Sequence, residues 1–137
     1  MKNLISKIIA VCFVFVVFAC NVEGEERLDY YKNQHRSPEL MGWWRQINDI
    51  NNPENPEYLN FTNFKFFSYN YIPETGVYAS GFDYWYNDEN YMYFLDAPSP
   101  TGGVNERKHK YTLNTTKDTL KMFVVSSPYI YVKSQGL

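Results

Sequence analysis

A chain of 137 residues has room for a single domain, and its net charge of -2 argues against a nucleic-acid partner, which would favour a basic face. Aromatic residues make up 19% of the chain, with 13 Tyr and 10 Phe, and this excludes the charge-rich, aromatic-poor class of disordered proteins. We therefore expect one small folded domain whose core is filled largely by rings.

The start of the chain predicts export. Two lysines accompany an apolar run at 8–18, which is too short for a membrane span of roughly 20 residues but has the length of a signal-peptide core. It leads into Ala19 and Cys20, and a small residue before a cysteine resembles the lipobox of bacterial lipoproteins. The resemblance implies a signal peptide at 1–19, a lipid such as palmitate on Cys20, and anchoring in the cell envelope, at the outer membrane. An ordinary signal peptide with an incidental cysteine is the alternative.

Removal of the signal peptide would leave a mature chain without usable thiols. Cys12 would be lost and Cys20 acylated, so no disulfide, CxxC pair or thiolate metal site would be available. Residues 20–37 are polar and are predicted to be a tether between the bilayer and the domain. Their acidic start resembles a surface-export signal of some Bacteroidota, and a solvated linker explains it as well. Tyr30 and Tyr31 are candidates for a short helical turn that packs on the domain.

From residue 37 onward the sequence predicts one helical turn followed by strands. Ser37 suits the cap, Pro38 suits the first helical position, and Gly42 ends the turn. Short alternating runs then follow one another, separated by turns rich in Pro, Gly, Asn and Asp. Strands are expected at 43–47, 58–61, 64–71, 77–86, 91–95, 106–113, 120–125 and 129–133.

The strand pattern predicts an all-β domain at 38–137. In the strand expected at 77–86, rings alternate along one face while Ala79 and Trp85 lie on the other, so neither face is polar throughout. A sheet that curls around a pocket, or that a helix covers, has this property. We predict an antiparallel up-and-down barrel or half-barrel of about eight strands with a short N-terminal helical turn, or else a sandwich.

Several short motifs resemble one family in order along the chain. Leu40, Gly42 and Trp44 resemble the Leu-x-Gly-x-Trp start of small lipocalin-like lipoproteins of Bacteroidota, which are calycin-type barrels or half-barrels. The family's Gly-rich turn after the second strand is replaced by Asn63 and Phe64, and the loop at 97–104 looks like an insertion. Further residues resemble other elements of the family. Tyr58, Leu59 and Phe61 resemble its second strand, and Gly76, Val77 and Tyr78 its Gly-x-Tyr third element. Its Tyr-x-Leu and Asp-Thr-Leu hairpin is resembled by Tyr111, Leu113, Asp118, Thr119 and Leu120, and its closing strand by Tyr131 and Lys133.

The resemblance implies structural roles for Gly42 and Trp44. In lipocalins this tryptophan packs across the closed end of the barrel, and a basic side chain from a late strand covers its ring. Lys121 and Lys133 are the candidates for that side chain here. Plain core packing of Trp43 or Trp44 is the alternative.

Residues suited to catalysis are few. His35 falls in the predicted tether, and we assign His109, with Arg107 and Tyr111, to a solvated strand face. The sequence has no HExxH, GxSxG, P-loop or GxGxxG motif. We expect neither an enzyme, a cofactor nor a metal site. A small hydrolase is the weaker alternative and would require Asp83, Asp88 or His109 to line one cleft.

Acidic side chains also gather in the sequence around the turn at 87–90, and solvation of that turn explains them. A more informative group is formed by aromatic side chains beside Asn87 and Asn90. Rings suit flat ligands and sugars, because their faces stack while their polar tips form hydrogen bonds. Core filling explains the same rings. The candidate ligand-binding residues are Tyr78, Phe82, Tyr84, Trp85, Tyr86, Tyr91 and Tyr93.

The leading hypothesis is an envelope lipoprotein whose lipocalin-like domain binds a small apolar or glycan ligand, with the membrane as partner through its lipid anchor. The alternative is a protein-interaction module, such as an inhibitor, immunity partner or assembly factor of the envelope, that acts through surface loops and in particular the loop at 97–104.

Overall fold

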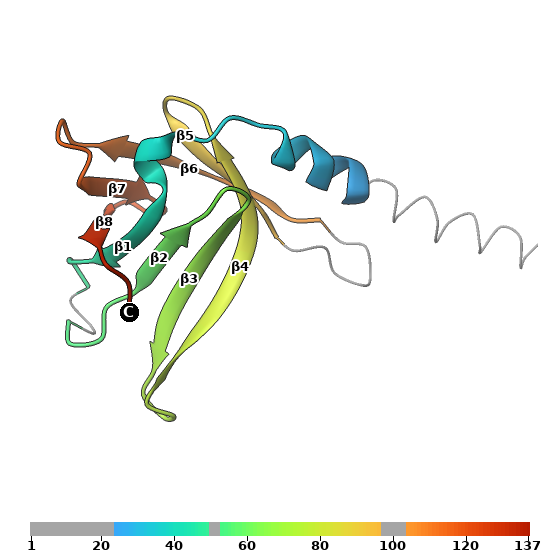
Figure 1. Ribbon diagram of the computed structural model, residues 1–137. Coiled ribbons are helices and arrows are strands. Elements are labelled where there is room, and N and C mark those ends of the chain that lie inside the picture. The colour runs from blue at the N-terminus through green and yellow to red at the C-terminus, as the bar shows by residue number, and fades with distance from the viewer. Residues whose placement is uncertain (1–23, 50–52, 97–103) are drawn as a thin grey trace, which may run out of the picture.

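Eight antiparallel strands close into a barrel in the computed structural model, which describes residues 24–49, 53–96 and 104–137 (Figure 1). Each strand pairs with its neighbours in sequence and β1 also pairs with β8, which confirms the all-β prediction and selects the closed barrel over the half-barrel and the sandwich. The strands are β1 (Gly42–Gln46), β2 (Tyr58–Phe61), β3 (Lys65–Ile72), β4 (Val77–Asn87), β5 (Tyr91–Asp96), β6 (Glu106–Leu113), β7 (Thr119–Phe123) and β8 (Tyr129–Ser134).

The core follows from the alternation of side chains along the strands. In β1, Trp44 and Gln46 are buried while Trp43 and Arg45 point to the outer side of the wall. The same alternation in the other strands brings rings and aliphatic side chains to one interior cluster. Its buried members are Leu40, Trp44, Leu59, Phe61, Phe66, Trp85, Met92, Phe94, Tyr111, Leu120, Met122 and Tyr131.

One end of the barrel, which we call the closed end, is plugged by Trp44. The 3-10 turn η1 (Pro38–Leu40) leads into Gly42, whose φ of +97 is disfavoured for residues with a Cβ. The Trp44 ring is fully buried, and its Nε1 donates to the carbonyl oxygen of Leu40 at 2.8 Å. The Lys133 Nζ lies 4.1 Å from the ring centroid and donates to the Met41 carbonyl at 2.5 Å. Trp44 is thus held by Leu40 on one side, and Lys133, not Lys121, covers its ring.

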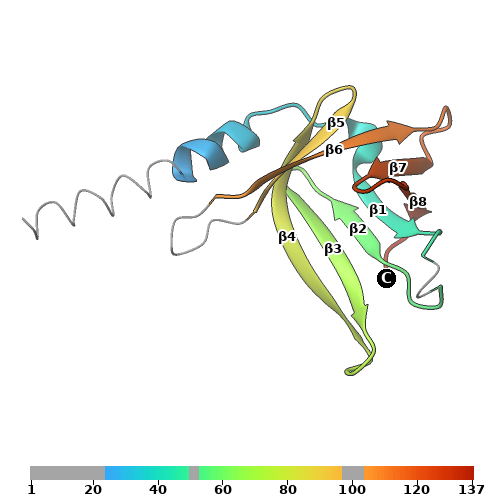
Figure 2. The ribbon, with the colours of Figure 1, turned by 180° about the vertical axis from the view of Figure 1, so that it is seen from behind.

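The opposite end, which we call the open end, carries a long hairpin. β3 and β4 pair up to Ile72 and Val77, but β4 pairs with β5 only from Asp83 onward. The tip of the β3–β4 hairpin therefore projects beyond the wall formed by the shorter strands (Figure 2).

A helix at 24–32 packs on the outside of the barrel, beside β4, β5 and β6 (Figures 1 and 2). The buried Tyr31 ring meets Tyr86 at 4.9 Å, and the Arg27 guanidinium lies 3.6 Å from the Glu106 carboxylate. The helical turn expected at Tyr30 and Tyr31 is confirmed and is longer than expected. Packing on the barrel thus begins before residue 38, within the segment predicted to be a tether.

The buried amide of Asn87 fixes the chain that follows this helix. Its Oδ1 accepts from the Ser37 backbone N–H at 2.8 Å, while its Nδ2 donates to Ser37 Oγ at 2.8 Å and to the Tyr111 hydroxyl at 3.0 Å. Among the described residues, no helix has both the length and the apolar character needed to cross a bilayer. Residues 1–23, which include the predicted signal peptide and Cys20, and the loop at 97–103 lie outside the described residues.

The contact between Lys133 and Trp44 predicts a measurable contribution to stability. Lys133→Met keeps an aliphatic side chain over the ring but removes the charge and the hydrogen bond to Met41, and should lower the free energy of unfolding by about 1 kcal/mol. Urea denaturation measures this loss. The matched control is Lys121→Met, because Lys121 is exposed on the outer side of β7. Equal losses in both variants would contradict the role of Lys133.

Candidate functional site

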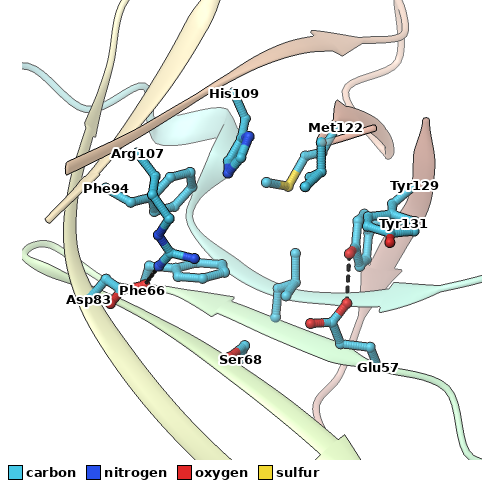
Figure 3. A pocket seen from close by; sticks show the side chains of 12 residues that line it. Glu57, Phe66, Ser68, Asp83, Phe94, Arg107, His109, Met122, Tyr129 and Tyr131 are labelled. Atoms are coloured by element: carbon cyan, nitrogen blue, oxygen red, sulfur yellow. Dashed lines mark hydrogen bonds and ion pairs between the residues drawn. The ribbon is translucent and has the colours of Figure 1, made fainter. Parts of the chain in front are cut away.

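A cavity of about 200 Å³ lies in the open half of the barrel (Figure 3). Its apolar wall is formed by Leu59, Phe66, Phe94, Met122 and Val124. Its polar wall is formed by Glu57, Ser68, Asp83, Arg107, His109, Tyr129 and Tyr131.

The polar lining comes from inward positions of five different parts of the sheet. Asp83 in β4 is in phase with the buried Trp85, and His109 in β6 is in phase with the buried Tyr111. Glu57 precedes β2 in phase with Leu59. Period-two alternation therefore places charged groups and core residues on the same interior face.

Arg107 is held by two carboxylates. Its guanidinium forms an ion pair with Asp83, toward which it points in Figure 3, and lies 3.3 Å from Asp96 Oδ1. The Asp83 side chain is only 15% exposed, and this burial raises the pKa of its carboxyl although the Arg107 charge opposes the shift. Two acids thus surround one base, and the charge of Arg107 is more than compensated.

Glu57 lies across the cavity from this cluster and has a neutral partner. The Tyr131 hydroxyl donates to Glu57 Oε2 at 2.7 Å (Figure 3). Burial raises the pKa of Glu57, the Tyr131 hydrogen bond opposes the rise, and the Asp49 charge adds to it. Burial and the Glu57 charge also raise the pKa of Tyr131. Within the described part of the chain, no Lys, Arg or His side chain forms an ion pair with Glu57.

The prediction that His109 lies on a solvated strand face is wrong. Its ring lines the cavity, 5.8 Å from the Phe94 ring, and burial together with the Arg107 charge lowers its pKa. Arg107, His109 and Tyr111 do share a face, as expected, but that face is the interior. The sequence could not choose between the faces of β6, because Lys108 and Lys110 make the other one polar as well.

The seven rings named as ligand-binding candidates do not line this cavity. Trp85 is fully buried at the closed half, where its Nε1 donates to the Thr62 carbonyl at 2.9 Å, as core filling requires. The other six are at positions that alternate with the interior residues and therefore lie on the outer side of the wall. Their part in binding stays a prediction for that outer side. They are Tyr78, Phe82, Tyr84, Tyr86, Tyr91 and Tyr93.

Some of these outer rings are brought together. Tyr86 and Tyr93 stack with centroids 4.5 Å apart, and Phe82 meets Tyr84 at 6.0 Å. The ammonium of Lys108 lies 3.9 Å from the centroid of Tyr91. The Tyr86–Tyr93 and Lys108–Tyr91 contacts join adjacent strands, whereas Phe82 and Tyr84 are neighbours on the same face of β4.

The acidic residues near the turn at 87–90 divide into two groups. Asp88 accepts from the backbone N–H groups of Asn90 at 2.8 Å and Tyr91 at 2.7 Å, which confirms turn solvation. Asp83 and Asp96 instead serve the Arg107 cluster. In residues 24–49, 53–96 and 104–137, no three His, Cys, Asp or Glu side chains are placed to hold a metal ion.

Glu57, Arg107 and Tyr131 are among the lining residues to which the sequence assigns no part in a site. The signal in the sequence is the spacing of two that puts residues on one strand face. Glu57 has this spacing to Leu59 and Phe61, and Tyr131 has it to Lys133, which covers Trp44. A charged residue in phase with core residues marks a polar group inside a barrel.

The buried Glu57 carboxyl predicts a pH dependence of stability. Because its pKa is raised by folding, it contributes stability that is complete below its unfolded pKa and is lost as the pH rises through the folded value. Glu57→Gln removes this loss. The free energy of unfolding of the variant minus that of the natural protein should therefore be larger at pH 8 than at pH 4. Urea unfolding at both values measures it, and an unchanged difference would contradict the burial of the charge.

Comparisons with known proteins agree with the fold. No protein-family model and no curated protein matches the chain in sequence. A lipocalin-like protein from Bacteroides uniformis ATCC 8492 matches in structure with a TM-score of 0.52 and 13% identity, over 70% of this chain and 99% of that one. An uncharacterized protein from Bacteroides eggerthii DSM 20697 matches with a TM-score of 0.50 and 14% identity, over 69% and 98%. The predicted lipocalin-like fold is confirmed, and identities this low show the fold alone.

Proposed function

We propose that the barrel binds a small amphipathic molecule in the cavity at its open end. The observation that carries this proposal is the composition of the cavity lining, in which the rings of Phe66 and Phe94 and the Met122 side chain lie among Glu57, Arg107 and His109. Pockets for small molecules combine apolar surface with polar groups that fix orientation, and the polar share is high in this cavity. The fold shared with a lipocalin-like protein supports the proposal.

The size of the cavity limits the ligand. A volume of about 200 Å³ is below the roughly 300 to 1,000 Å³ of pockets for drug-sized molecules. A short alkyl chain with one polar group, or a single sugar ring, is the class that fits, and a longer glycan would have to extend out of the open end.

We propose binding without catalysis. Ser68, Asp83 and His109 line the same cavity, which meets the sequence condition for a small hydrolase. A nucleophile, however, needs a base within hydrogen-bond reach, and in Figure 3 Ser68 and His109 lie on opposite sides of the cavity. Asp83 is engaged by Arg107 instead of His109. Binding of a ligand therefore accounts for the lining better than acid-base chemistry.

A protein-interaction function is the second candidate, and one observation on the outer wall favours it. Rings on β1, β3 and β4 form a continuous row: Trp43 lies 5.0 Å from Tyr69, Tyr69 lies 6.4 Å from Phe67, and Phe67 lies 5.9 Å from Phe82. Phe82 is 38% exposed, and exposed aromatic clusters are typical of protein interfaces.

We also propose that the protein is an outer-membrane lipoprotein anchored through Cys20. The lipobox-like sequence supports this, and the helix at 24–32 adds a structural consequence. At most three residues, 21–23, separate Cys20 from the described part of that helix, and three residues of any conformation span no more than about 10 Å. The anchor would therefore hold the helix, and the barrel packed on it, close to the bilayer surface.

Filling the cavity tests the proposed binding site. Ser68→Trp places a large side chain into the space and should abolish binding of any ligand that the natural protein retains, whether detected by native mass spectrometry or by titration. Ser80→Trp is the matched control, because Ser80 lies exposed on the outer side of β4. Loss of binding in the control alone, or in neither variant, would move the site away from the cavity.

Cys20→Ser tests the anchor. In a lipoprotein this change blocks acylation and processing, so the variant should lose all incorporated palmitate label and should keep residues 1–19, as intact mass measures. A natural protein that carries no label and is cleaved in the same way as the variant would show an ordinary signal peptide.

A further inference from the structure

We propose that the cavity selects a cation, namely a small primary amine whose ammonium group binds Glu57 and whose alkyl part packs on the apolar wall. This inference rests on the proposed ligand binding in the barrel and adds the chemical class of the ligand. Three properties of the described residues support it: the net charge of the lining, the position of the basic side chains, and the Glu57 carboxylate oxygen that accepts no hydrogen bond.

The lining carries more negative than positive charge. Glu57 and Asp83 are acidic, Arg107 is the basic partner of Asp83, and Asp96 adds a second acid to Arg107 at 3.3 Å. His109 is buried beside the Arg107 charge, which favours its neutral form. The cavity and its rim therefore have an uncompensated negative charge, which a ligand cation would balance.

The other basic side chains are placed where they do not neutralise Glu57. Lys108 covers Tyr91 at 3.9 Å on the outer side of β6, and Lys65 covers Phe82 at 4.2 Å on the outer side of β3. Lys133 occupies the closed end over Trp44. Within residues 24–49, 53–96 and 104–137, Arg107 is the basic residue that lines the cavity, and it is already shared by two acids.

Glu57 has an acceptor position left for a ligand. Its Oε2 accepts from Tyr131 at 2.7 Å, whereas none of the described residues donates a hydrogen bond to its Oε1. An ammonium group has three donors and no acceptor, so it suits a carboxylate in this state. The rings of Tyr129 and Tyr131 line the same end of the cavity, and aromatic faces attract cations.

The competing ligand classes fit this site less well. A carboxylate or phosphate ligand would have to share Arg107 with Asp83 and Asp96, which both contact its Nη2, and would then lie in the same cavity as the Glu57 carboxylate. A neutral alcohol can use the apolar wall but leaves the Glu57 charge without a counter-ion. Between ligands of equal length, the amine should therefore bind most tightly.

The experiment uses the full-length protein in a deuterated non-ionic detergent, with its methionine methyl groups labelled with ¹³C. The Met122 methyl reports on the cavity, and the Met41 methyl reports on the closed end. The probes are n-pentylamine, n-pentanol and n-pentanoate, titrated separately at pH 8. The dependence of the Met122 chemical shift on probe concentration gives the affinity. We expect the affinity for the amine to be at least tenfold higher than for the other two probes, and we expect no shift of the Met41 signal.

Two variants assign the selectivity to Glu57. Glu57→Gln should lower the affinity for the amine at least tenfold and leave the affinity for pentanol unchanged. Glu54→Gln is the matched control, because Glu54 is exposed in the same loop, and it should bind the amine as the natural protein does.

The outcomes separate this inference from the proposed function. If pentanol or pentanoate shifts Met122 with equal or higher affinity than the amine, the cavity binds a ligand but does not select a cation, and the inference is overturned. If none of the three probes shifts Met122, both the inference and the proposed binding function are overturned. Equal loss of amine affinity in both Glu variants would also overturn the role of Glu57.

Discussion

The pairing of β1 with both β2 and β8 is the constraint on which the rest of the structure depends. Trp44 lies opposite Leu59 in β2 and opposite Lys133 in β8, so the two pairings together put its ring, its neighbour and its covering cation in place. Closure also leaves no free edge between the first and the last strand. Once the sheet is closed, side chains that alternate along a strand point alternately into the barrel and out to its surface.

The interior that results is packed at one end and polar at the other. At the closed end, the Trp44 N–H and the Asn87 amide find partners within the chain, and buried rings fill the remaining space. At the open end, Glu57, Asp83 and Arg107 face an internal cavity. Buried charges cost stability unless they are well paired, and apolar residues of similar size would often stabilise a core more. The ion pair of Arg107 with Asp83 and the hydrogen bond from Tyr131 to Glu57 partly offset this cost.

Prediction of the fold succeeded where a pattern was local and repeated. The strand expected at 58–61 is the observed β2, and the motif around Gly42 and Trp44 led to the closed end and to Lys133. Prediction of the site failed where it depended on which face of a strand points into the barrel. The sequence predicts ligand-binding roles for the tyrosines of β4 and β5, which lie on the outer wall, and a solvated face for Arg107 and His109, which line the cavity. A strand with polar or aromatic residues on both faces does not show which face is buried.

By itself, the sequence determined that the chain forms one all-β domain, where most strands begin and end, and which residues share a strand face. These properties depend on alternation, turn chemistry and ring content over short stretches. Only the tertiary structure decided that the sheet closes, that the helix at 24–32 packs on its outer side, and that Glu57 and Arg107 meet across one cavity. The physical reason is that Glu57 and Arg107 stand 50 residues apart in sequence, and their proximity is created by the pairing of all the strands between and around them.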